Sequence, residues 1–176
     1  MENLKYPIGE FKAPAHYDHA LRADLIHVLK EAPYNLQKAI KGLNSDQLNT
    51  PYRENGWTVS QVVHHLSDSH MNSYIRFKLA LTENNPIIKP YDEKQWAVLP
   101  DTVNTHPSVS LSLLESLHNR WTNLLSSLNE EEFSRSFVHP ETNRTMNLNK
   151  ALALYAWHSE HHIAHITSLR DRMGWN

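Results

Sequence analysis

The stretch Leu148 to Met173, LNKALALYAWHSEHHIAHITSLRDRM, has the apolar pattern of one long helix that faces a protein core. At about 100° per residue, its aliphatic side chains and Tyr155 gather on one side of the helix. Asn147 and Gly174, which flank the stretch, are residue types that commonly begin and end helices. We therefore predict a final helix over about residues 148–173, packed along most of its length.

The histidines of this helix point to a metal ion. His158 and His162 are four residues apart and lie about 70° and 30° from the centre of the apolar side. His165 lies farther from it, and His161 is predicted to be mostly outside. Imidazoles four apart share one face of a helix and can reach one cation. A third nitrogen from another helix would complete a three-histidine site with an open position for water.

A second cluster, Val62-Val63-His64-His65-Leu66-Ser67-Asp68-Ser69-His70, can supply that third nitrogen. His64 and His65 both lie at the margin of the apolar side of their helix, so periodicity does not choose between them. His70 lies near the apolar centre and could be an ordinary packed histidine. Without a metal, inward imidazoles need hydrogen-bond partners or cost stability.

The rest of the chain has the pattern of a bundle. Pro33 should kink or split a helix over about residues 18–43, and Thr58-Val-Ser-Gln61 has the form of a capping box. Four long helices joined by one long crossover loop indicate an all-α four-helix bundle, as a single domain over residues 1–176. The other predicted segments are an extended leader over 1–15, a connector with one helical turn over 45–56, helices over 58–81 and 110–128, the crossover loop over 84–107, and a small hairpin or extended segment over 136–146.

Composition narrows the class of protein. The 176 residues include 17 Lys and Arg against 19 Asp and Glu, so the net charge of −2 disfavours a nucleic-acid or membrane partner. The absence of cysteine excludes thiolate ligands and disulfides. No apolar run reaches the length of a membrane span, and MENLKYPIGEFKAP lacks the pattern of a signal peptide. We therefore expect a cytoplasmic protein.

Three familiar active-site patterns do not fit. The helical zinc-protease motif needs Glu directly after the first histidine, whereas Glu160 comes two residues after His158 and is predicted to be directed away from it. A ferritin-like di-iron site needs two Glu-x-x-His motifs, and only Glu115-x-x-His118 occurs. A serine hydrolase would need a Gly-x-Ser-x-Gly elbow, which the chain lacks.

Several motifs resemble the YfiT branch of the DinB-like superfamily over nearly the whole chain. They are Pro51-Tyr52-Arg53, Gly56-Trp57-Thr58-Val59, the histidine cluster of residues 61–72, Tyr91-Asp92-Glu93-Lys94, and the run from Trp157 to Ile166. The resemblance implies a four-helix bundle, often dimeric, with one divalent metal per chain, zinc or else nickel. The implied ligands are His65, His158 and His162, and the choice of His65 over His64 rests on the resemblance alone.

The same resemblance implies an enzyme acting on a small molecule. The family's label, metal-dependent hydrolase, is an inference from the metal site rather than from a substrate. The YfiT branch also resembles bacillithiol S-transferases, which join a low-molecular-weight thiol to an electrophile. Because a metal can activate either water or a thiol, the site fits both reactions, and no catalytic side chain is assigned.

Further residues could serve such a site. Asp68 and Asn72 follow His65 by one and two turns and could orient a ligand imidazole or contact substrate, although polar residues on the helix surface are the favoured interpretation of each. Arg53 could hold a carboxylate of a thiol. A rival interpretation is a non-catalytic metal-binding bundle of a stress response, but three ligands without an obvious fourth favour catalysis, because structural sites are usually closed by four.

Overall fold

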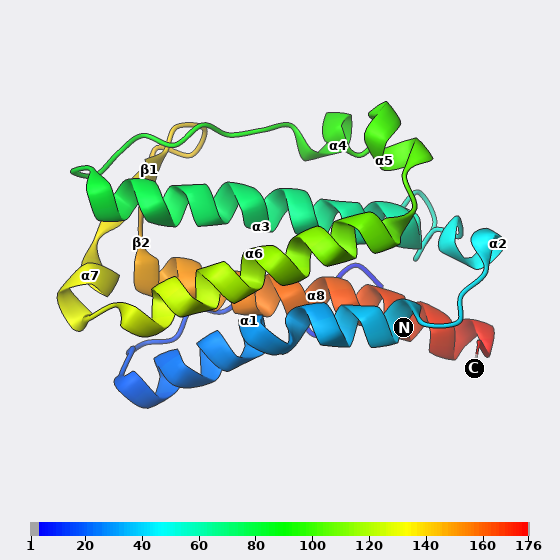
Figure 1. The fold of residues 1–176 in the computed structure, drawn as a ribbon, viewed down its shortest axis with the longest axis horizontal. Coiled ribbons are helices and arrows are strands. Elements are labelled where there is room, and N and C mark those ends of the chain that lie inside the picture. The colour runs from blue at the N-terminus through cyan, green and yellow to red at the C-terminus, as the bar shows by residue number, and fades with distance from the viewer. Residues whose placement is uncertain (1–3, 176) are drawn as a thin grey trace.

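Four long helices form the bundle that the sequence predicts (Figure 1). The computed structural model describes residues 4–175, so the first three residues of the expected leader lie outside it. Helix α1 packs against α6 and α8, and α3 packs against the same two helices from the other side. The long helices are α1 (His19–Ile40), α3 (Val59–Thr82), α6 (Pro107–Ser127) and α8 (Leu148–Met173).

The ends of the two histidine-bearing helices follow their capping residues. The Oγ1 atom of Thr58 accepts from the backbone N–H of Gln61, and the Gln61 side chain accepts from the N–H of Thr58, which completes the predicted capping box of α3. Asn147 caps α8, and Gly174 ends it with a left-handed φ of 64°. These signals hold both helices close to their predicted bounds.

Helix α1 runs without interruption through Pro33, so of the two predicted effects, a kink or a split, the split does not occur. Proline lacks the N–H that would bond to the carbonyl of Leu29, four residues earlier. That carbonyl accepts a hydrogen bond from Nδ1 of His118 on α6 instead. Because a side chain satisfies the freed carbonyl, the helix continues through the proline.

The segment 84–107 is a crossover, but it is more ordered than a plain loop. It contains two short helices, α4 (Glu93–Trp96) and α5 (Pro100–Asn104), and lies along the outer side of α3 (Figure 1). Gln61 Nε2 donates to the carbonyl of Ala97 at 2.9 Å, which ties the segment to α3. This segment therefore covers the face of α3 that a bare bundle would expose.

The remaining elements are short. Residues 4–15 contain no helix or strand, the connector holds the predicted turn, and residues 136–147 form the hairpin that was one of two predicted possibilities. These elements are α2 (Ser45–Leu48), α7 (Glu130–Ser134), β1 (Ser136–His139) and β2 (Arg144–Asn147), with Ser136 paired to Asn147.

Two clusters of buried apolar side chains stabilise the bundle. One is built around Phe77, Trp121 and Leu152, and the other around Leu36, Val63 and Ile166, all fully buried. Neither cluster includes His65, His158 or His162. Among the described residues, no helix is long and apolar enough to cross a membrane.

Candidate metal centre

Helices α3 and α8 bring three histidines to one point. His65 comes from α3, and His158 and His162 come from successive turns of α8. One ring nitrogen of each lies within 4.8 Å of the other two, and the Nε2 atoms of His65 and His158 are 3.3 Å apart. The pair predicted from helical phase and the partner implied by the family resemblance thus converge.

The environment keeps these rings uncharged at neutral pH. Burial lowers the pKa of His65 to about 4. Burial, followed by the neighbouring imidazoles, holds the pKa values of His158 and His162 well below their usual range. Metal ligands must be neutral imidazoles, so no proton has to be displaced from these three rings.

The arrangement fits a metal ion better than an ordinary packed cluster. Two nitrogens at zinc-bond lengths and a tetrahedral angle are about 3.3 to 3.4 Å apart, which matches the separation between His65 and His158. One nitrogen of His162 completes the set within 4.8 Å of the other two. Convergence of three ring nitrogens at this spacing is what a site for a cation requires.

Behind the triad, three more groups continue the hydrogen bonding into the core. His158 Nδ1 and His70 Nε2 are 3.1 Å apart, and His70 Nδ1 and His118 Nε2 are 2.8 Å apart. His118 Nδ1 bonds to the carbonyl of Leu29. His70 and His118 are 0% and 1% exposed, so His70 is a packed histidine that also contacts a member of the triad.

His118 was missed as a site residue because its Glu-x-x-His motif was considered only for a di-iron centre. Its spacing from Leu114, Trp121 and Leu125 places it on the apolar face of α6, and that signal predicts a buried imidazole in need of partners.

Two hollows reach the triad from either side of α4. The first, called here the His158 hollow, has a volume of about 560 Å³ and also includes Arg76, Tyr91 and Tyr155. The second, the His162 hollow, has a volume of about 750 Å³ and includes Lys5 and Arg53. Glu93 and Lys94 line both hollows, so α4 stands between two approaches to the same centre.

The other histidines of the two clusters have separate roles. His64 contacts Ser110 Oγ on α6 at 2.7 Å and the carbonyl of Thr105 at 3.1 Å, so it links α3 to the start of α6 and to the residue that follows α5. The prediction that His161 is mostly outside is wrong, since it is 7% exposed. The ring of Trp157, on the same helix, packs against it, and so does the ring of Tyr6 from the N-terminal segment.

The three further candidates, Asp68, Asn72 and Arg53, have different surroundings in the structure. Asn72 Nδ2 donates to the backbone carbonyl of Asp68 at 2.8 Å, so it is engaged within its own helix. Asp68 is half-buried, and burial together with the Asp101 carboxylate raises its pKa to about 6. Arg53 lines the His162 hollow and contacts the ring of Tyr52.

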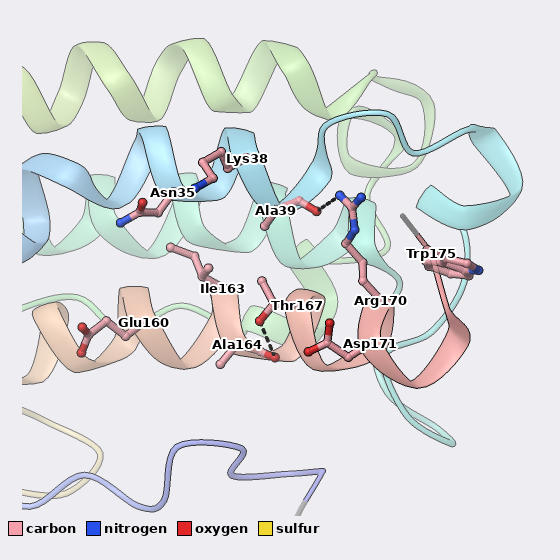
Figure 2. Close-up of a pocket in the computed structure, with 10 residues that line it drawn as sticks. All are labelled: Asn35, Lys38, Ala39, Glu160, Ile163, Ala164, Thr167, Arg170, Asp171 and Trp175. Carbon is pink, nitrogen blue, oxygen red and sulfur yellow. Dashed lines mark hydrogen bonds between the residues drawn. The ribbon is translucent and has the colours of Figure 1, made fainter.

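A further hollow, between α1 and α8, lies apart from the triad. It has a volume of about 450 Å³, and none of the three histidines lines it (Figure 2). Glu160 is exposed and borders this hollow, as expected for a side chain directed away from His158. Arg170 closes one end by donating to the carbonyls of Ala39 and Lys41. This hollow offers no imidazole to a ligand.

Comparisons with known proteins agree on one family. The model of the DinB superfamily matches residues 29–166. "Putative metal-dependent hydrolase YfiT" of Bacillus subtilis is 55% identical over 174 residues, covering 99% of this chain and 98% of that protein. A Bacillus licheniformis relative with the same description is 53% identical over the full length of both chains.

A solved structure extends the likeness to three dimensions. The structure of YfiT from Bacillus subtilis is described as "a probable metal-dependent hydrolase with an unusual four-helix bundle topology". It matches this chain with a TM-score of 0.97 at 55% identity and covers 99% of both chains. The expected four-helix bundle is thereby confirmed.

Proposed function

Because the chain belongs to the DinB superfamily, we propose that it is a metal-dependent enzyme, with a hydrolase acting on a small molecule as the leading candidate. One divalent cation per chain would be held by His65, His158 and His162, with zinc as the first candidate and nickel as the second. The convergence of three neutral ring nitrogens within 4.8 Å carries the proposal.

The number of ligands favours catalysis over a structural role. Among the described residues, the cluster that could hold a metal contains three histidines and no fourth side chain. Structural zinc sites are usually closed by four protein ligands, whereas catalytic sites keep one position open. A divalent cation at such a site lowers the pKa of a water or a thiol beside it.

The charges around the centre indicate the kind of substrate. Lys5, Arg53 and Lys94 line the His162 hollow against a single carboxylate, that of Glu93. A small molecule carrying a carboxylate or phosphate would be attracted to this side. Arg53 is the proposed contact for that group, since its guanidinium can bind a carboxylate through two hydrogen bonds.

Transfer of a low-molecular-weight thiol, of the bacillithiol type, is the alternative that one observation favours. A hydrolase needs one organic substrate, whereas a transferase must bring two reactants to the same centre. The two hollows on either side of α4 provide two approaches. They also differ in charge. The His158 hollow has three carboxylates against two cations, whereas the His162 hollow has three cations against one carboxylate.

The first test is the elemental metal content of protein purified without an affinity tag or a nickel column. Wild type should carry about one equivalent of metal, and His65→Ala, His158→Ala and His162→Ala should each lose it. His64→Ala is the matched control, because His64 is equally buried on α3 but bonds to Ser110 and Thr105. Absence of stoichiometric metal in wild type would overturn the proposal.

The second test separates the two reactions. Metal-replete protein is assayed with activated esters and amides, with and without an anionic thiol, and with a fluorogenic electrophile plus that thiol. Thiol-independent turnover that is lost in the three alanine variants supports hydrolysis, and turnover that requires the thiol supports transfer. Sedimentation of the same samples tests the expected homodimer.

A further inference from the structure

We propose that His118 and His70 are positioning residues for the metal centre, which hold His158 as the tautomer whose Nε2 atom carries no proton. The inference rests on the proposed metal site, and it concerns residues that lie behind that site rather than in it. Four hydrogen-bonding groups are involved, one from each long helix of the bundle.

The chain of hydrogen bonds begins at Pro33. Because proline has no N–H, the carbonyl of Leu29 has no partner within α1. His118 Nδ1 lies within hydrogen-bonding distance of this carbonyl. A carbonyl oxygen can only accept, so the proton of His118 must be on Nδ1. The Nε2 atom of the neutral His118 ring is therefore an acceptor.

The same logic passes through the next two rings. His118 Nε2 accepts, so His70 Nδ1, 2.8 Å away, must donate. His70 Nε2 then carries no proton and must accept from His158 Nδ1, which is 3.1 Å away. A neutral imidazole has one proton, so Nε2 of His158 is left bare. This is the atom that lies 3.3 Å from Nε2 of His65, within the triad.

Burial keeps the direction of the chain from reversing. A protonated His118 would donate from both nitrogens and would reverse the bonds to His70 and His158. Burial lowers the pKa of His118 to about 4, so the neutral ring dominates at neutral pH. The rings of His70 and His118 are nearly parallel, with 12° between their planes and centroids 4.9 Å apart, which suits a hydrogen bond lying in the plane of both rings.

This arrangement differs from the usual support of a metal-binding histidine. The second ring nitrogen of such a ligand commonly donates to a carboxylate, a backbone carbonyl or water. Here the acceptor is the Nε2 atom of His70, which can accept only if the proton of that ring is on Nδ1. His70 therefore depends on His118, and His118 depends on a carbonyl that a proline has freed.

The first experiment reads the tautomers directly in metal-free wild-type protein. Long-range proton–nitrogen correlation NMR at neutral pH assigns the protonated nitrogen of each histidine. The expected result is a proton on Nδ1 in His118, His70 and His158. A proton on Nε2 in any of the three would overturn the proposal. This readout needs no metal, so it decides the tautomer question even if the proposed metal site fails.

The second experiment measures metal affinity in paired variants. His118→Leu removes both hydrogen bonds, whereas His118→Gln keeps an amide N–H for Leu29 and an amide oxygen for His70. We expect His118→Leu to bind zinc about 10 to 100 times more weakly, and His118→Gln to remain close to wild type. His64→Leu, which removes another buried imidazole from α3, should also remain close to wild type.

Thermal unfolding of the same variants separates positioning from general loss of packing. If zinc affinity falls in proportion to thermal stability in all three variants, or is unchanged in His118→Leu, the proposal is wrong. If His118→Leu does not fold, the tautomers of metal-free wild-type protein decide the proposal, because that measurement needs no variant.

Discussion

Removing the metal should lower the thermal stability of this protein without unfolding it. The two buried apolar clusters that hold the four helices together contain none of the three triad histidines. Without a cation, His65 can still donate to the bare Nε2 of His158 across 3.3 Å, so part of the site stays satisfied. The metal-free bundle should therefore keep its helices and unfold cooperatively.

The size of the effect follows from mass action. Zinc at 100 times its dissociation constant stabilises the folded state by about 2.7 kcal/mol. For a chain of 176 residues, each kcal/mol corresponds to a shift in midpoint of about 2 to 4 °C, so the expected rise is about 5 to 11 °C.

Circular dichroism melts of chelator-treated protein, repeated with increasing zinc, measure this shift. His162→Ala should show no shift, and His64→Leu should shift as wild type does. Loss of the cooperative transition in metal-free wild type would refute the reasoning and favour a structural metal, because structural zinc sites contribute most of the folding free energy of small domains. No shift in wild type would exclude a specific site.

Three further predictions concern single side chains. Asp68→Asn should raise the free energy of unfolding by about 1 kcal/mol above pH 6 and leave it unchanged below about pH 4, as measured by urea unfolding. Burial raises the pKa of the Asp68 carboxyl from 3.8 to about 6, so its ionisation destabilises the folded state as the pH rises, and asparagine removes that cost. Equal stabilisation at both pH values would contradict this explanation. Pro33→Ala should change the free energy of unfolding by no more than about 1 kcal/mol. Alanine favours the helix by about 3 kcal/mol over proline. The loss of the buried ring and the greater flexibility of the unfolded chain offset most of that gain. Its new N–H competes for the Leu29 carbonyl, so calorimetry should show weaker zinc binding, and unchanged binding would count against the role of that carbonyl. Arg53→Gln should raise KM for an anionic substrate about tenfold with little change in kcat; a lower kcat at constant KM would assign Arg53 a different role.

The helices and one pair of site histidines could be predicted because they depend on local signals. Capping residues set the start of α3 and both ends of α8. His158 and His162 share a face of α8, and the apolar residues of the same helix define which face is inside. Both inferences need only the spacing of residues along one helix.

Helical periodicity could not choose between His64 and His65. Residues 62–67 of α3 are all buried, because the crossover segment 84–107 covers the side that periodicity would assign to solvent. When a helix is buried on all sides, it has no polar face, so periodicity cannot show which residues at the edge of the apolar face point toward the bundle core. His161 was misplaced for a similar reason, since residues outside the bundle cover it.

The roles of Pro33, Leu29 and His118 could not be predicted from any one helix. A proline within a helical pattern predicts a break unless the carbonyl it frees finds another partner. That partner is 89 residues away in sequence, and only the packing of α6 against α1 brings it within reach.

The walls of the His162 hollow have a consequence for how this scaffold can diversify. The three proposed ligands lie on long helices, whereas Lys5, Arg53 and Lys94 lie in the N-terminal segment, the connector before α3 and the crossover segment. Mutations in those three segments can alter which molecule is selected while the cation site and the apolar interior stay intact. Related proteins with this fold can therefore differ in the molecule they select through substitutions in these peripheral segments, with little loss of stability.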